Sequence, residues 1–153
     1  MILDYELKLD FKDVLIRPKR STLTSRKEVE LKRKYNFRNA KLSTPHKGHN
    51  LISDYEGIPI MASNMDGVGT FKIAERISKS GLFTCLTKTY NENELIKFFK
   101  DTNISDYVAV SIGISEFDVK KFSKLYKAVG KKIKYVCIDV ANGYTELFSD
   151  FII

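Results

Sequence analysis

Four short apolar runs, each followed by a polar turn, mark the part of the chain after residue 57. They are Ile58–Ala62, Leu82–Leu86, Tyr107–Gly113 and Tyr135–Ala141. Short apolar runs without alternation are typical of strands that are buried on both faces of a parallel sheet. The pattern therefore predicts four buried strands.

Helical patterns separate these runs. Thr70 is a suitable N-cap for a helix whose apolar positions share one face and which Gly81 ends. Asn91 caps a second helix that ends near Thr102, and a third helix is expected from Glu116 to Val129. Strands and helices that alternate in this way predict an α/β fold with a parallel sheet and right-handed connections.

The choice between α/β folds depends on the turn after the first strand. No Gly-x-Gly-x-x-Gly follows it, which disfavours a dinucleotide-binding doubly wound sheet. A (β/α) barrel fits better, and barrels carry their active sites at the carboxyl ends of the strands. The groups expected at those ends are Asn64–Asp66, Lys88, Ser111–Gly113 and Asp139.

The first 57 residues have a different pattern. Glu28–Leu31 and Lys34–Phe37 alternate polar with apolar residues, which predicts a half-exposed strand outside the main sheet. The segment Asn39–Gly57 is polar and irregular and is interpreted as a surface insertion. We therefore divide the chain into an N-terminal extension, residues 1–57, and a barrel segment, residues 58–153. His46 and His49 lie in the insertion without further ligands, so no metal site is predicted.

Charge and composition narrow the class of protein. The chain of 153 residues is 43% apolar and carries a net charge of +7, which suggests anionic partners such as nucleotide phosphates or nucleic acid. Cations gather between Arg17 and Lys27, where charge alone favours a solvated loop over a phosphate site. Aromatic residues are not interleaved with these cations, which disfavours nucleic-acid binding.

The same composition gives an expected location. No apolar run approaches the ~20 residues of a membrane span, and the N-terminus lacks the order of a secretory signal. Cys85 and Cys137 both fall in predicted buried strands. They are expected to be reduced core thiols of a cytoplasmic protein.

The last predicted element begins at Thr145 and stops within a helical pattern. Four βα units are about half of a barrel, which typically needs ~250 residues. A half barrel would leave two open apolar edges. We therefore expect a truncated chain that represents the N-terminal half of a barrel.

Several motifs carry a resemblance to a known family. They are the run Leu9–Leu23 (LDFKDVLIRPKRSTL) with Ser25-Arg26, then Ala62–Asp66 (ASNMD), Val68–Phe71 (VGTF), Lys88-x-Tyr90 and Ile138–Tyr144 (IDVANGY). Together they resemble GMP reductases, in the family's order and over nearly the whole chain. IMP dehydrogenase, a close relative, usually has serine or proline within the stretch Ala62–Asn64, so the reductase is preferred.

The resemblance implies a (β/α) barrel that uses NADPH to reduce GMP to IMP with release of ammonia, in purine nucleotide salvage. It implies that Ser25 and Arg26 hold the adenosine end of NADPH across a subunit interface. Lys88 would face the cofactor, with Asp139, Val140 and Ala141 along its nicotinamide ribose. Without the resemblance, a surface cation at Lys88 and a helix cap at Asp139 are equally good interpretations. The triplet Asn64, Met65 and Asp66 would lie near the base, and the full-length protein would be a homo-tetramer.

The family's nucleophile loop, Gly-x-Gly-x-Gly-Ser-x-Cys-Thr-Thr, does not occur in this sequence. That loop would also supply a monovalent cation (K⁺) site. Cys85 and Cys137 precede its expected place and do not match the nucleophile, so no catalytic residue is assigned in this chain. Three positions depart from the family pattern: Gly67 stands for a threonine, and Thr87 and Thr89 stand for histidines.

Two other hypotheses remain. The chain could be a non-catalytic nucleotide-binding or assembly module derived from this family, or an IMP dehydrogenase-like fragment. A downstream Gly-Ser-x-Cys-Thr-Thr loop, in frame or frameshifted, would favour the enzyme over the module.

Overall fold

The structure, a computed structural model, describes residues 5–36 and 54–152. Backbone contacts divide the chain into two units, one ending at Glu30 and the other beginning at Leu31. The first unit holds two short 3-10 helices, Phe11–Asp13 and Arg26–Glu28, and all of its described residues are exposed. The predicted division after Gly57 stays a prediction.

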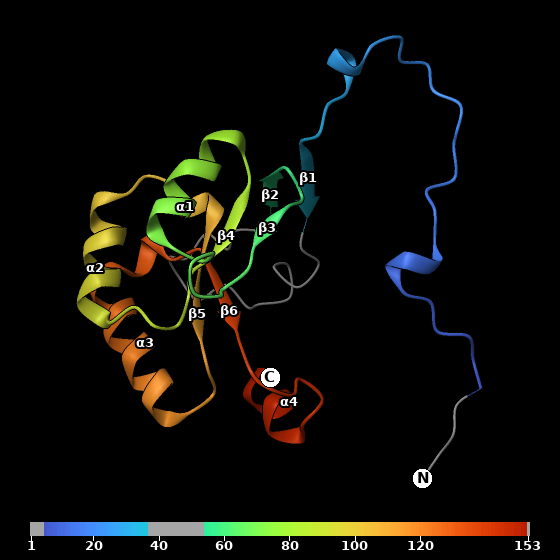
Figure 1. Cartoon of the computed structure of the whole chain (residues 1–153). Coiled ribbons are helices and arrows are strands. Elements are labelled where there is room, and N and C mark those ends of the chain that lie inside the picture. Colours follow the sequence, from blue (N-terminus) through green and yellow to red (C-terminus); the bar gives the residue numbers. More distant parts are fainter. Residues whose placement is uncertain (1–4, 37–53, 153) are drawn as a thin grey trace. The chain divides into compact units, whose positions relative to one another are not determined.

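The second unit is built on a four-stranded parallel sheet with the order β3-β4-β5-β6 (Figure 1). Its strands are β3 (Met61–Ala62), β4 (Phe83–Cys85), β5 (Val108–Ile112) and β6 (Tyr135–Ile138). The helices that follow the strands are α1 (Phe71–Ile77), α2 (Glu92–Asp101), α3 (Glu116–Val129) and α4 (Glu146–Ile152). The predicted α/β alternation with a parallel sheet is confirmed.

Helices α1, α2 and α3 cover one face of the sheet and form the larger core with it (Figure 1). Alternate side chains of β5 point into this core, where Val108, Val110 and Ile112 are buried. Phe99 of α2 and Leu125 of α3 meet them and are almost inaccessible to solvent.

The predicted cap residues Thr70 and Asn91 each accept a hydrogen bond from a backbone N–H in the first turn of their helix. The helical stretch of α1 and its short 3-10 extension ends at Gly81, as predicted, and Gly81 has the left-handed conformation.

A two-stranded antiparallel hairpin contributes to the other face. It pairs β1 (Arg33–Asn36) with β2 (Asp54–Gly57), with Tyr35 opposite Tyr55. The ring of Tyr55 meets the edges of Phe83, Tyr107 and Tyr135, with centroids 5.5–6.2 Å apart. Burial, and then the neighbouring tyrosines, raise the pKa of Tyr55. Tyr55, Phe83 and Tyr135 belong to the second and smaller core, which also contains Cys85, Ala109 and Cys137.

The two outer strands are less buried than predicted. In the run Ile58–Ala62 only Met61–Ala62 forms a strand, and Ile60 and Met61 are 58% and 60% exposed. Strand β6 ends at Ile138 and is only half-buried, whereas the prediction extended it to Ala141. Each of these strands pairs with a single neighbour among the described residues, so one side of it has no strand to cover it. The inner strands β4 and β5 are fully buried, as predicted.

Two predictions about the N-terminal region need correction. Of the predicted half-exposed strand, the described residues form a strand at Arg33–Asn36, which is exposed throughout, and residues 26–28 form a 3-10 helix instead. The surface insertion predicted up to Gly57 includes a strand, β2, which pairs with β1 outside the main sheet. His46, His49 and the rest of that insertion lie outside the described residues.

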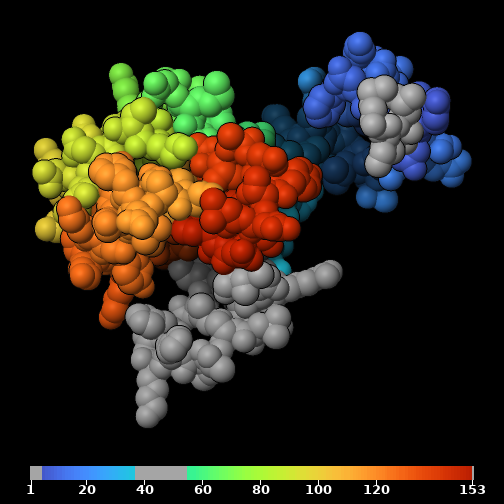
Figure 2. All heavy atoms as spheres, turned by 90° about the horizontal axis from the view of Figure 1, so that it is seen from below, coloured from blue at the N-terminus to red at the C-terminus, as the bar shows by residue number. Residues whose placement is uncertain are grey.

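Helix α4 lies at the surface, where Figure 2 shows it in red, and it has no buried residue. Thr145 caps it by accepting a hydrogen bond from the N–H of Phe148, at 3.2 Å. Across residues 5–36 and 54–152, none of the helices is both long enough and apolar enough to cross a membrane.

The two cysteines pack into the same smaller core but are buried to different degrees. Both are free thiols, and Cys137 packs against the smaller core but is only half-buried, so it is less buried than predicted whereas Cys85 is buried as predicted. The reason is that Cys137 lies on the outer strand β6. The Cys85 thiol lies 3.2 Å from the sulfur of Met61, and burial, followed by the neighbouring Cys137, raises its pKa to about 12.

This shift predicts a loss of stability in alkali. An unfolded chain would release the Cys85 proton near the ordinary value of 9.0, whereas the folded chain retains it up to about 12. The unfolded state therefore binds fewer protons between these pH values, and the free energy of unfolding falls as pH rises through that range. At pH 10.5 we expect a loss of about 1–2 kcal/mol relative to pH 7.5. Urea unfolding under reducing conditions measures this loss, and Cys85→Ala should make it smaller, with a remainder from Tyr55, whose pKa is also raised. Parallel pH profiles for the two proteins would contradict the assignment.

Candidate functional site

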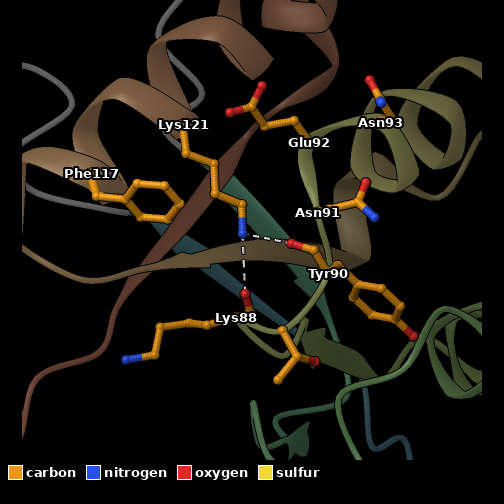
Figure 3. A pocket seen from close by; sticks show the side chains of 8 residues that line it. Lys88, Tyr90, Asn91, Glu92, Asn93, Phe117 and Lys121 are labelled. Carbon is orange, nitrogen blue, oxygen red and sulfur yellow. Dashed lines mark hydrogen bonds between the residues drawn. The ribbon is translucent and has the colours of Figure 1, made fainter.

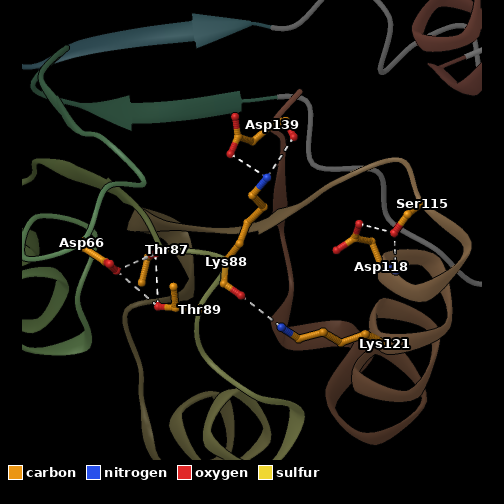
Figure 4. Close-up of polar contacts among 8 residues, drawn as sticks. All are labelled: Asp66, Thr87, Lys88, Thr89, Ser115, Asp118, Lys121 and Asp139. Carbon is orange, nitrogen blue, oxygen red and sulfur yellow. Dashed lines mark hydrogen bonds and ion pairs between the residues drawn. The ribbon is translucent and has the colours of Figure 1, made fainter. Parts of the chain in front are cut away.

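Polar side chains gather at the edge of the sheet where the parallel strands end. Since all four strands run in the same direction, the loops after β3, β4, β5 and β6 leave from this edge. Figure 4 shows the side chains that these loops and the start of α3 bring together. They are Asp66, Thr87, Lys88, Thr89, Ser115, Asp118, Lys121 and Asp139.

The loop after β3 lies against the end of β4. The N–H of Thr87 donates to the carbonyl of Gly69 at 2.8 Å, and a side chain at residue 69 would collide with backbone atoms of Ser63, Cys85 and Thr87. This close approach brings Asp66 to β4, where its carboxylate accepts hydrogen bonds from the hydroxyls of Thr87 and Thr89, both at 3.4 Å. The two threonines that depart from the family pattern therefore contact one carboxylate.

Lys88 and Asp139 form an ion pair. The Lys88 amine lies 3.0 Å from the Asp139 carboxylate and also donates to the Asp139 carbonyl at 3.3 Å. The backbone N–H of Asp139 donates to the carbonyl of Ile112 at 2.8 Å, which fixes Asp139 at the end of β5. The two side chains are 43% and 40% exposed, so the pair is open to solvent on one side. It is a half-exposed pair that a ligand can reach.

This geometry disfavours the two structural interpretations, a free surface cation at Lys88 and a helix cap at Asp139. Lys88 is not a cation extended freely into solvent, because it is paired. Asp139 does not cap the helix that follows it, because Thr145 occupies the cap of α4. The structure therefore brings two sequence-predicted site residues together. Their role in binding a cofactor stays a prediction.

A second carboxylate stands near Lys88. Asp118 lies in the first turn of α3, and the Ser115 hydroxyl donates to its carboxylate at 2.5 Å. This hydrogen bond, with smaller contributions from the Gly113 and Ser115 backbones and from the charge of Lys88, lowers the pKa of Asp118. Asp118 was not among the predicted site residues. The only sequence pattern that points to Asp118 is its spacing from Ser115, Ser-x-x-Asp, which is typical of a capped helix N-terminus.

An open cavity of about 460 Å³ lies between the β4–α2 loop and α3 (Figure 3). On its α3 side stand Phe117 and Lys121, and the rest of its lining is Lys88, Thr89, Tyr90, Asn91, Glu92 and Asn93. Phe117 is 73% exposed. The Lys121 amine points at the loop and donates to the carbonyls of Lys88 and Tyr90, at 3.1 and 2.6 Å. Sequence reasoning missed Lys121 because its partners are backbone atoms.

The other predicted site residues have simpler surroundings. Ser25 caps the 3-10 helix Arg26–Glu28 by accepting a hydrogen bond from the N–H of Lys27, and Arg26 is exposed in the first unit.

The remaining predicted site residues belong to the second unit. Val140 is half-buried and Ala141 is exposed, and both lie between β6 and α4. Of the loop after β3, Asn64 is half-buried and Met65 is 63% exposed. Ser111 is buried within β5, and its hydroxyl has no hydrogen-bond partner among the described residues.

Metal ligands do not cluster in the part of the chain that the structure describes. Among residues 5–36 and 54–152, no three His, Cys, Asp or Glu side chains come together in a way that could hold a metal ion. The expected K⁺ site depended on a loop that is not in this sequence, so it stays a prediction.

Comparison with known proteins identifies relatives over almost the whole chain. The chain is 46% identical to a GMP reductase of Onchocerca volvulus, 46% identical to one of Ascaris suum and 44% identical to GMP reductase 1 of Mus musculus. Each match covers 98% of this chain but only 39–40% of the relative. The chain thus spans about two fifths of the length of these curated relatives. No family model matches the chain.

A solved structure shows the fold. The crystal structure of inosine 5′-monophosphate dehydrogenase from Legionella pneumophila matches with a TM-score of 0.68 and 22% identity, over 93% of this chain and 38% of that one. The parallel sheet with its helices therefore corresponds to part of a (β/α) barrel, as predicted. At this level of identity the match bears on the fold alone.

The close contact at Gly69 gives a test of how the site loop is held. Gly69→Ala should lower the free energy of unfolding by about 2–3 kcal/mol or more, because the new methyl group meets backbone atoms that cannot turn away. Gly67→Ala is the matched control, since residue 67 has φ 77° but open space around a Cβ. It should cost only about 1 kcal/mol, from the left-handed conformation. Chemical denaturation measures both, and equal costs would show that the contact does not constrain the loop.

Proposed function

The chain is related to the GMP reductases over 98% of its length, and on that premise we propose that it serves the NADPH-dependent reduction of GMP to IMP with release of ammonia. The observation that carries the proposal is an identity of 44–46% to three reductases across nearly every residue. The nucleotide substrates GMP and IMP, the homo-tetramer and the cytoplasmic location expected from the resemblance belong to this proposal. The chain spans only about two fifths of the length of its relatives, so the complete reaction also belongs to this proposal.

The residues at the sheet edge fit an NADPH molecule by their chemistry. A carboxylate that is 40% exposed can accept hydrogen bonds from two ribose hydroxyls, and an amine that is 43% exposed can donate to an anionic group. Asp139, Val140 and Ala141 would hold the nicotinamide ribose, with Lys88 beside them. Ser25 and Arg26 would hold the adenosine end across a subunit interface. NADPH, when bound, supplies the hydride that reduces the purine.

The ion pair would prepare the carboxylate before the cofactor arrives. The Lys88 amine holds Asp139 through both its carboxylate and its carbonyl, so the carboxylate need not be ordered on binding. The N–H of Asp139 is held by Ile112 of β5, a strand that is buried throughout. Binding groups on a rigid support lose less entropy when they engage a ligand. The loop with Asn64, Met65 and Asp66 would lie towards the purine base.

The nucleophilic cysteine is proposed to lie in sequence that this chain does not contain. Neither Cys85 nor Cys137 is suited to the role. Cys85 is buried among apolar groups that raise its pKa to about 12, so it carries almost no thiolate at neutral pH. Cys137 lies in strand β6 and not in a loop at the sheet edge.

A second candidate function is a non-catalytic nucleotide-binding or assembly module derived from the same family. The half-exposed pair of Lys88 and Asp139 favours it, because this pair lies within the chain and a nucleotide can contact it without any nucleophile loop. Such a module would bind NADPH or GMP without turnover. An IMP dehydrogenase-like fragment is a further alternative.

Cofactor binding tests the proposal directly. Asp139→Ala should weaken NADPH binding by roughly tenfold to a hundredfold, because a hydrogen bond to a charged group contributes about 1.5–3 kcal/mol. Titration of NADPH fluorescence with the 153-residue chain measures the dissociation constant. An unchanged constant would remove Asp139 from the cofactor site.

Asp106→Ala is the matched control. Asp106 also pairs with a lysine, Lys134, but it precedes β5 and therefore lies at the opposite edge of the sheet. This variant should lose an ion pair and keep its NADPH affinity. Equal weakening by both variants would indicate a general loss of structure, which circular dichroism would detect.

An assay of IMP formation distinguishes this chain from a complete reductase. We expect no IMP from GMP and NADPH with the 153-residue chain alone, because it contains no matching nucleophile loop. Chromatographic separation of IMP from GMP measures this, with a complete GMP reductase as the positive control. NADPH-dependent IMP formation by this chain would overturn the exclusion of Cys85 and Cys137.

A further inference from the structure

Lys121 makes an unusual contact for a helix lysine. It projects from the second turn of α3, and its amine donates to the carbonyls of Lys88 and Tyr90, at 3.1 and 2.6 Å (Figure 3). Both carbonyls belong to the loop between β4 and α2. A charged amine that bridges two residues of one loop fixes the backbone of that loop, not the side chain of a partner.

Lys88 is held at both its backbone and its side chain. Its carbonyl is held by Lys121 of α3, while its own amine reaches Asp139 beyond β6 (Figure 4). The hydroxyls of its two neighbours, Thr87 and Thr89, donate to Asp66. The direction of the Lys88 side chain therefore depends on how its backbone is held.

The other end of the loop has an anchor of its own. The ring of Tyr90 stacks on Phe71 with centroids 3.7 Å apart, and its hydroxyl accepts a hydrogen bond from the N–H of Phe71 at 3.2 Å. This anchor joins the loop to the start of α1. It would remain if Lys121 were replaced, so the loop should stay folded while the position of Lys88 is relaxed.

We propose that Lys121 is a positioning residue, which fixes the main chain at Lys88 and Tyr90 and thereby sets where the Lys88 amine meets Asp139 and an anionic ligand. For NADPH as that ligand, the inference rests on the proposed function. The contact with Asp139 is a property of the chain itself. Lys121 acts without touching the ligand.

A neighbouring lysine offers a matched control. Lys124 lies on the same helix, three residues further on, and pairs with Glu92 in the first turn of α2 at 3.5 Å. Its side chain is 69% exposed, and it contacts the helix beyond the loop instead of the loop carbonyls. Lys124→Met therefore removes an ion pair between α3 and α2 and leaves the contacts of the Lys88 backbone as they are.

The test uses two readouts on the full 153-residue chain. The first is the rate at which the Lys88 amine reacts with acetic anhydride, followed by peptide mass spectrometry. Lys121→Met should raise this rate severalfold, because the Lys88 amine is released from Asp139.

The second readout is NADPH affinity. Lys121→Met should weaken it by about tenfold, because the Lys88 amine would be displaced by on the order of 1 Å. Lys121→Arg should retain wild-type values, since a guanidinium can also donate to two carbonyls.

The outcomes are distinguishable. Faster labelling and weaker NADPH binding in Lys121→Met, with Lys124→Met unchanged in both, would support the inference. Unchanged labelling in Lys121→Met would overturn it. Faster labelling in a chain whose wild type does not bind NADPH would support the positioning of Lys88 and overturn the proposed function. Faster labelling with unchanged NADPH affinity would overturn the role towards the cofactor.

Discussion

The ion pair between Lys88 and Asp139 joins the ends of two strands that are not neighbours. Lys88 follows β4 and Asp139 follows β6, so the pair passes the end of β5, which lies between them. Such a contact is feasible only if both loops start at the same edge, which the parallel direction of the strands ensures. The pair also needs β5 to be short and fixed, and its five residues are all buried. The position of the candidate site thus depends on the register of the central strand.

The strength of this arrangement comes from backbone contacts more than from charge. An ion pair that is about 40% exposed contributes little to stability, because water and salt screen it. The loops are instead held by main-chain hydrogen bonds, from Thr87 to Gly69 and from Asp139 to Ile112, both at 2.8 Å. The charged side chains are therefore free to exchange one partner for another without loss of the fold. This separation of support from recognition suits a binding site.

The sequence was a good guide where burial is local and a poor one where it depends on neighbours. Strands β4 and β5 were predicted because their apolar runs are buried whatever lies outside the sheet. The outer strands have similar runs but only one partner strand each in the described structure, so their burial was overestimated. Strand β2 was missed because its pairing with β1 is a long-range contact and its four residues carry no period.

The candidate site divides in the same way. Lys88 and Asp139 could be predicted, since each is a charged residue near the carboxyl end of an apolar strand and each belongs to a family motif. Asp118 and Lys121 could not, because their roles depend on where α3 packs against the loop after β4. A lysine that donates to backbone carbonyls has no partner residue type to reveal it in the sequence. Thr87 and Thr89 were noted as departures from the family, and their shared contact with Asp66 required the structure.

The aromatic cluster around Tyr55 has a spectroscopic consequence. The chain contains no tryptophan, so its near-ultraviolet circular dichroism arises from tyrosines and phenylalanines held in fixed orientations. Tyr55 belongs to the hairpin, whereas Phe83, Tyr107 and Tyr135 belong to the sheet or the turn before it, and their rings meet at nearly right angles. The signal of this cluster therefore reports the docking of the hairpin, separately from the helical signal at shorter wavelengths. A partly ordered chain that retains its helices but releases the hairpin would be recognised by this difference.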